Sequence, residues 1–216
     1  MRHGTRRHAR WAAASALVAG AIVLAGCGPS PWALQSPEPT VTDPAGSAAP
    51  TDVAPPVEND LSGGSTERQV TAGAVTATID YWSTLRMDKW TPNAVKPVSL
   101  SMITKVKPND GQKVYLQKAT MLAVPANATE SFEALTPQVD ESSLNGTPGY
   151  LVLSPYSYSQ TFNVGQVPAE ATYVTVQFTF DYLVQTTPKS KEYAKQTASD
   201  TLTIAIAQPA DDGAED

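Results

Sequence analysis

The sequence of 216 residues predicts an all-β protein, whose folded part is a single immunoglobulin-like β-sandwich of about seven strands. Several segments alternate apolar and polar side chains with a period of two, which is the pattern of a half-buried strand and not of an amphipathic helix. Turn-forming residues separate these segments, and about seven such strands are typical of an immunoglobulin-like sandwich. A small barrel is the alternative arrangement of the same strands.

The first half of the domain contains three expected strands. In residues 75–85, Val75, Ile79 and Tyr81 share one face. Residues 98–106 and 113–124 follow, separated by a Pro-Asn-Asp-Gly turn sequence in which proline fixes φ and glycine accepts positive φ. We therefore expect these two strands to pair as a hairpin. The segment 127–135 is expected to form one or two helical turns.

The second half contains the clearest strand, residues 171–184, in which valine and aromatic side chains alternate with threonine, glutamine and aspartate. Residues 201–207 are expected to pair with it across the intervening loop. Two shorter strands, 150–153 and 156–164, are separated by Pro155, which interrupts a hydrogen-bonded ladder.

The first 26 residues have the features of an export signal. Four arginines and no acidic residue precede an uncharged, apolar run over residues 11–24. A basic start, a short apolar run and small residues at its end are typical of a secretory signal peptide. The apolar run is shorter than the roughly 20 residues that a transmembrane helix needs. An arginine pair, Arg6-Arg7, leaves export by the general or by the twin-arginine route open.

The sequence Leu-Ala-Gly-Cys at residues 24–27 resembles the lipobox of bacterial lipoproteins and contains the chain's only cysteine. The resemblance implies that a diacylglyceryl group is attached to Cys27 and that the signal is cut before it. Two acyl chains anchor a protein stably, whereas one chain holds it only marginally. We therefore expect a protein held at the cell membrane on its extracytoplasmic side.

Composition divides the rest of the chain. Residues 27–68 contain eight of the 18 prolines among Ser, Thr, Ala and Gly, which predicts a disordered tether after the lipidated cysteine. Residues 69–208 are expected to form the sandwich domain, and residues 209–216 an acidic, disordered tail. We find no sequence signature that assigns the domain to a named family.

Loss of the signal removes both histidines and four arginines, which leaves 11 basic and 21 acidic residues and a formal charge of −10. A chain without histidine or a free thiol lacks the groups of serine- and cysteine-based catalytic sites and of imidazole or thiolate metal sites. We therefore expect no cofactor and no metal. Nucleic acid is excluded as a partner because the chain shows no basic cluster in sequence.

Four aromatic residues are candidate ligand contacts: Trp82, Trp90, Tyr156 and Tyr158. Exposed aromatic rings on a sandwich can stack on sugars or bind a protein partner. Three hypotheses follow: a non-enzymatic binding or structural domain of the cell envelope, acting on an envelope protein; a module that binds carbohydrate or wall polymer through these aromatics; and a hydrolase that uses only carboxylates. The absence of a nucleophile or phosphate-binding motif favours the first.

Overall fold

The computed structural model describes residues 57–142 and 146–208. The predicted signal peptide, Cys27, the tether up to residue 56 and the acidic tail lie outside these residues and stay predictions. Among the described residues, no helix is long and apolar enough to cross a membrane.

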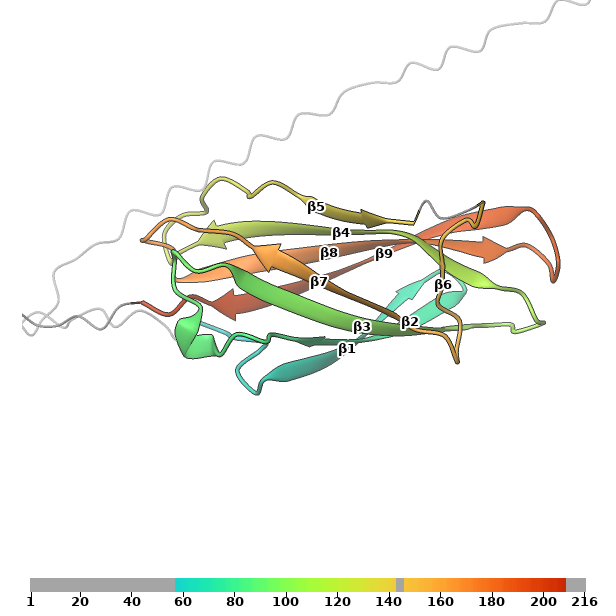
Figure 1. Cartoon of the computed structure of the whole chain (residues 1–216), viewed down its shortest axis with the longest axis horizontal. Coiled ribbons are helices and arrows are strands. Elements are labelled where there is room, and N and C mark those ends of the chain that lie inside the picture. The colour runs from blue at the N-terminus through green and yellow to red at the C-terminus, as the bar shows by residue number, and fades with distance from the viewer. Residues whose placement is uncertain (1–56, 143–145, 209–216) are drawn as a thin grey trace, which may run out of the picture. The chain divides into compact units, whose positions relative to one another are not determined.

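Two antiparallel sheets pack face to face, which confirms the β-sandwich (Figure 1). The first sheet has the order β1-β2-β3-β7, and the second has the order β5-β4-β8-β9 with β6 paired to β4. The strands are β1 (Ser65–Ala72), β2 (Val75–Trp82), β3 (Lys96–Val106), β4 (Val114–Ala126), β5 (Gln138–Glu141), β6 (Tyr150–Leu151), β7 (Tyr158–Val164), β8 (Tyr173–Gln185) and β9 (Tyr193–Ala205), and a short 3-10 turn, η1, covers Met87–Lys89.

The connections follow the immunoglobulin pattern with two strands added to its seven, β1 and the two-residue β6, which pairs with β4. The chain crosses from the first sheet to the second between β3 and β4, returns with β7 beside β3, and crosses again to place β8 between β4 and β9. This alternation between sheets is the Greek-key connectivity of such sandwiches. β1 extends the first sheet beyond β2.

The core lies between the sheets and is built from the inward side chains of the alternating strands. Phe178 of β8 packs against Tyr81 of β2 and Phe162 of β7, with ring centroids 5.3 and 5.6 Å apart. These contacts join the two sheets, and burial of each large apolar side chain stabilises the fold by about 1.5–3 kcal/mol.

The expected hairpin between residues 98–106 and 113–124 is wrong. β3 pairs with β2 and β7, whereas β4 pairs with β8, β5 and β6 in the other sheet. The chain does bend at Pro-Asn-Asp-Gly, where Gly111 has a φ of +94°, but such a sequence determines only the local path of the chain. It does not determine whether the next strand continues the same sheet or crosses to the facing one.

The folded domain begins earlier than the expected boundary at residue 69. Leu61 is fully buried in the core, and β1 begins at Ser65. β9 also begins earlier than expected, at Tyr193. The expected helical turns over residues 127–135 are absent; Asn127 instead closes a tight turn by accepting hydrogen bonds from the backbone N–H groups of Thr129 and Glu130.

Candidate functional site

Trp90 is not available to a ligand, because its side chain is completely buried. It directly follows η1, and its indole N–H donates to the Ser83 hydroxyl oxygen at 3.2 Å. Its carbonyl accepts a hydrogen bond from the Ala207 N–H at 3.0 Å, near the end of the described chain. Trp90 therefore closes the core at the end where both described termini lie (Figure 1).

Tyr158 is also buried and links the two sheets. Its hydroxyl donates to the Asp140 carboxylate at 2.6 Å, and the Tyr150 hydroxyl donates to the other carboxylate oxygen at 3.2 Å. The two tyrosine rings lie 5.2 Å apart. Burial, and then the hydrogen bond to Asp140, raise the pKa of the Tyr158 phenol well above its usual range. Tyr158 thus connects β7 to β5 instead of facing solvent.

Trp82 and Tyr156 remain accessible but do not form one platform. Trp82 is half-buried on the outer face of the first sheet, where strand register places it beside Ser99 and Ser99 beside Thr161. A hollow of about 230 Å³ lies against it, lined also by Ser159 and Thr161. Tyr156 is 57% exposed. It lies before the start of β7 and does not line the hollow beside Trp82.

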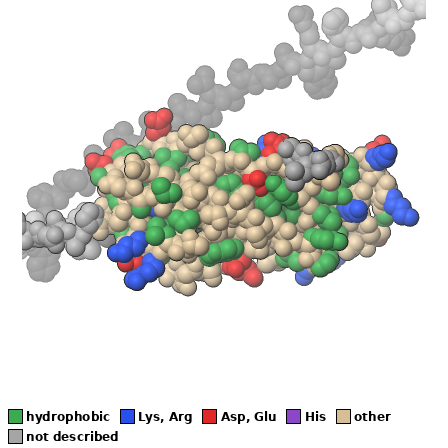
Figure 2. All heavy atoms as spheres, in the orientation of Figure 1, with side chains coloured by type: hydrophobic (Ala, Val, Ile, Leu, Met, Phe, Trp, Pro, Cys, Tyr) green, Lys and Arg blue, Asp and Glu red, His purple; other side chains and the backbone are tan. Residues whose placement is uncertain are grey.

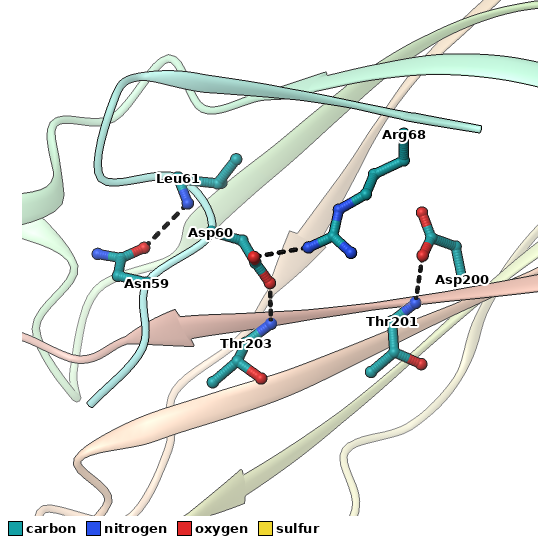
Figure 3. Close-up of polar contacts among 7 residues, drawn as sticks. All are labelled: Asn59, Asp60, Leu61, Arg68, Asp200, Thr201 and Thr203. Carbon is teal, nitrogen blue, oxygen red and sulfur yellow. Dashed lines mark hydrogen bonds and ion pairs between the residues drawn. The ribbon is translucent and has the colours of Figure 1, made fainter. Parts of the chain in front are cut away.

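A polar cluster closes the open side of the sandwich between β1 and β9 (Figure 3). Arg68 points inward from β1 and forms an ion pair of 2.6 Å with Asp60. Asp60 also pairs with the edge of β9: its carboxylate accepts from the Thr203 N–H at 2.7 Å, and its own N–H donates to the Thr203 carbonyl at 2.9 Å. Asp60 therefore occupies hydrogen-bonding groups that a further strand would need.

Asp200 completes this cluster from β9. One carboxylate oxygen accepts from the Thr201 N–H at 2.8 Å, whereas the other is buried without a hydrogen bond, as is the Tyr81 hydroxyl. Burial first, and the negative charge of Asp200 second, raise the pKa of the Tyr81 phenol far above its usual range. The Tyr81 hydroxyl and the Asp200 carboxylate both face the open side of the sandwich between β1 and β9, where Arg68 carries a positive charge.

The opposite edge, on β7, is capped by glutamine side chains. The Gln138 amide accepts from the Asn163 N–H at 3.0 Å and donates to the Asn163 carbonyl, so that one side chain reproduces the pairing of a strand. The Gln160 amide oxygen accepts from the Thr161 N–H at 2.9 Å. Unpaired edge groups invite pairing with another chain, and side chains that occupy them oppose it.

Lys96 is fully buried at the start of β3, beneath the loop after η1. Its ammonium group donates to the carbonyl oxygens of Ala94 at 2.6 Å, Thr91 at 3.2 Å and Pro92 at 3.3 Å. Burial lowers the pKa of Lys96 from 10.5 to about 8. The side chain holds this loop in place but does not reach solvent.

Two further hollows of the described surface contain few carboxylates. One of about 330 Å³ lies between β4 and β7 and is lined by Met121, Leu135 and Gln166, and another of about 360 Å³ lies beside η1. The second contains one carboxylate, that of Asp88, and the first contains none. Within residues 57–142 and 146–208, no group of three or more His, Cys, Asp or Glu side chains could hold a metal ion.

The fold brings together two groups of residues that the sequence does not place together. Tyr115 of β4 and Tyr193 of β9 form an edge-to-face pair with ring centroids 5.9 Å apart. The end of the sandwich next to this pair, which we call the lysine pole, carries six exposed lysines: Lys105, Lys107, Lys113, Lys189, Lys191 and Lys195. Of these six lysines, the three within residues 189–195 are the most closely spaced in the sequence, so only they could have indicated the lysine pole. The expectation that the chain has no basic cluster does not hold in three dimensions.

No protein-family model and no curated protein matches this chain.

Proposed function

We propose that the protein is an exported lipoprotein, anchored to the membrane through Cys27, whose β-sandwich acts by binding or by structural contact at the cell envelope. The observation that carries the proposal is the Leu-Ala-Gly-Cys sequence after a basic start and a short apolar run. The diacylglyceryl group holds the protein on the extracytoplasmic side, and the Pro-rich segment connects it to the domain.

The arrangement of the domain supports a tethered binding role. The two described termini lie at one end, since the Asp60 N–H bonds to Thr203 near the end of β9 and the Ala207 N–H bonds to Trp90. A tether that enters at residue 57 holds the domain by this end. The strands then extend away from it, and the 13 residues of β8 span about 43 Å.

The anchor is tested by replacing Cys27 with serine in the full chain. We expect Cys27→Ser to leave the membrane fraction for the soluble fraction, or to accumulate as uncut precursor, and to incorporate no labelled fatty acid. Ser30→Ala is the matched control, because it leaves the lipobox intact and should behave as the wild type. A Cys27→Ser chain that is processed and membrane-bound like the wild type would contradict the proposal.

Binding of a wall polysaccharide by Trp82 is the second candidate function. The hollow beside this indole is bordered by the hydroxyl groups of Ser159 and Thr161, and an aromatic face next to hydroxyl groups suits a sugar ring. Trp82→Ala should then abolish retention on isolated cell wall, while Tyr156→Ala retains it. Equal retention of both variants would count against this candidate. The third hypothesis, a hydrolase that uses only carboxylates, gains no support from Trp82 or from the hollows described above.

A further inference from the structure

We propose that the lysine pole and the adjoining Tyr115–Tyr193 pair bind an anionic polysaccharide, one that carries carboxylate or phosphate groups. The inference deepens the proposed function by naming a surface and a partner class for the binding domain. It rests on that function for its cellular setting only, because binding by the pole can be measured on a chain that carries no lipid.

Two loops distant in sequence form the pole. Lys107 and Lys113 belong to the β3–β4 loop, and Lys189 and Lys191 belong to the β8–β9 loop. Gln185 joins the loops. Its side-chain oxygen accepts from the backbone N–H of Lys113 at 2.9 Å, and its backbone N–H donates to the Lys113 carbonyl at 3.0 Å. In Figure 2 blue side chains lie at the right-hand end of the molecule, where these loops lie in Figure 1, and a second blue group lies at its lower left.

The charge of the pole is largely uncompensated. Among the described residues, Lys195 is the one lysine of the six that forms an ion pair, at 3.1 Å to Asp181, which Lys118 also approaches at 3.4 Å. The two loops contain only two acidic residues, Asp110 and Glu192. A positive excess of this kind on a chain of formal charge −6 is a local attraction for anions.

The neighbouring surface has the chemistry of a sugar site. Tyr115 and Tyr193 are half-buried on the outer face of the second sheet, and register places Lys195 in the same row as Tyr115, across Leu183. Hydroxyl groups continue along this face, contributed by Thr120, Thr175, Thr179, Thr197, Ser199, Thr201 and Thr203. Cations, ring edges and a row of hydroxyls together match the carboxylate or phosphate groups, the ring faces and the hydroxyl groups of a charged sugar polymer.

The pole does not lie at the end of the domain where the described chain begins. It lies at the end opposite residue 57, through which the chain leads back to Cys27 (Figure 1). β8, which is 13 residues long, spans about 43 Å between these two ends of the domain.

The experiment uses the full chain carrying Cys27→Ser and measures its binding to immobilised polygalacturonate, with dextran as the neutral polysaccharide and polyglutamate as the acidic polypeptide. We expect binding to polygalacturonate and not to dextran. It should weaken as NaCl approaches 0.15 M, where charges are screened beyond about 8 Å. Polyglutamate should bind more weakly than polygalacturonate.

The matched pair of variants changes the net charge equally at the two ends of the domain. Lys113→Gln/Lys191→Gln, at the pole, should weaken binding roughly fivefold to tenfold, since exposed ion pairs contribute up to about 1 kcal/mol each. Arg86→Gln/Lys89→Gln, at η1, should leave binding unchanged. Tyr193→Ala should weaken binding to polygalacturonate while leaving binding to polyglutamate unchanged.

Three outcomes would overturn the inference. Equal effects of the two charge variants would show that total charge, and not the pole, governs binding. Polyglutamate binding as tightly as polygalacturonate, with no effect of Tyr193→Ala, would indicate an acidic protein as partner. Loss of binding on Trp82→Ala alone would place the sugar site on the first sheet, and the proposed function would still stand. Failure of the anchor test would not affect the result for the pole, because the two tests measure different properties.

Discussion

Replacement of the buried Lys96 by methionine should make the domain less stable at high pH but leave it nearly unchanged at neutral pH. The pKa of Lys96 falls from 10.5 in the unfolded chain to about 8 in the folded one. Between these values the unfolded state binds more protons, so the free energy of unfolding rises with pH. At 1.36 kcal/mol per pKa unit the full contribution is about 3 kcal/mol, of which we expect about 2–3 kcal/mol after relaxation.

The contacts of the ammonium group determine the effect at neutral pH. Of its three carbonyl partners, Thr91 also accepts from the Ala94 N–H and Pro92 also accepts from the Val167 N–H, so only the Ala94 carbonyl loses its partner in Lys96→Met. A buried acceptor without a partner costs about 1–3 kcal/mol. This loss offsets the relief of removing a buried charge, and the variant should therefore lie within about 1 kcal/mol of the wild type at pH 7.

Urea denaturation at a series of pH values from 7 to 10 measures the difference. The wild type should gain about 2–3 kcal/mol relative to Lys96→Met over this range. Tyrosine ionisation affects both chains and cancels in the comparison. Lys89→Met, at an exposed lysine, is the control and should follow the wild type. Parallel stability curves for the wild type and Lys96→Met would refute the assignment of a shifted pKa to this lysine.

Three further substitutions test individual contacts by the same denaturation assay. Gly149→Ala should cost at least about 3 kcal/mol, because a Cβ there would lie 2.3 Å from the Leu116 carbonyl oxygen on β4; a smaller loss would mean that β6 can shift away. Tyr158→Phe should cost about 1 kcal/mol through loss of the hydrogen bond to Asp140, and an unchanged midpoint would show that this bond is replaced by solvent. Asp60→Ala should cost about 1–3 kcal/mol and also promote self-association, seen as a larger species in gel filtration; a variant that stays monomeric would count against its role as an edge cap.

The strands that could be predicted are those whose inward positions are apolar. β2, β3, β4 and β8 alternate cleanly, and the sequence locates all four. β1 was missed because its inward positions include Thr66 and Arg68, so it carries no hydrophobic alternation. The charge of Arg68 is tolerated at an inward position because Asp60, eight residues earlier, forms an ion pair with it.

The candidate site was predicted less well than the fold, because exposure depends on partners distant in sequence. Trp90 and Tyr158 are buried in the core, where their polar atoms bond to Ser83 and Asp140, and no local sequence pattern indicates either contact. The lysine pole joins loops about 80 residues apart, and only the crossing of the chain between sheets brings them together. The role of Cys27 stays a prediction from sequence.

The side-chain caps on β7 and β9 matter most where many copies share one surface, as the proposed anchor would arrange. Confinement to a plane raises the effective concentration of neighbouring domains far above that in bulk solution, and strand edges held side by side can then template one another. Gln138 and Asp60 occupy those edges from within the same molecule. On the proposed anchor, these caps would keep crowded copies as separate units and leave each lysine pole free.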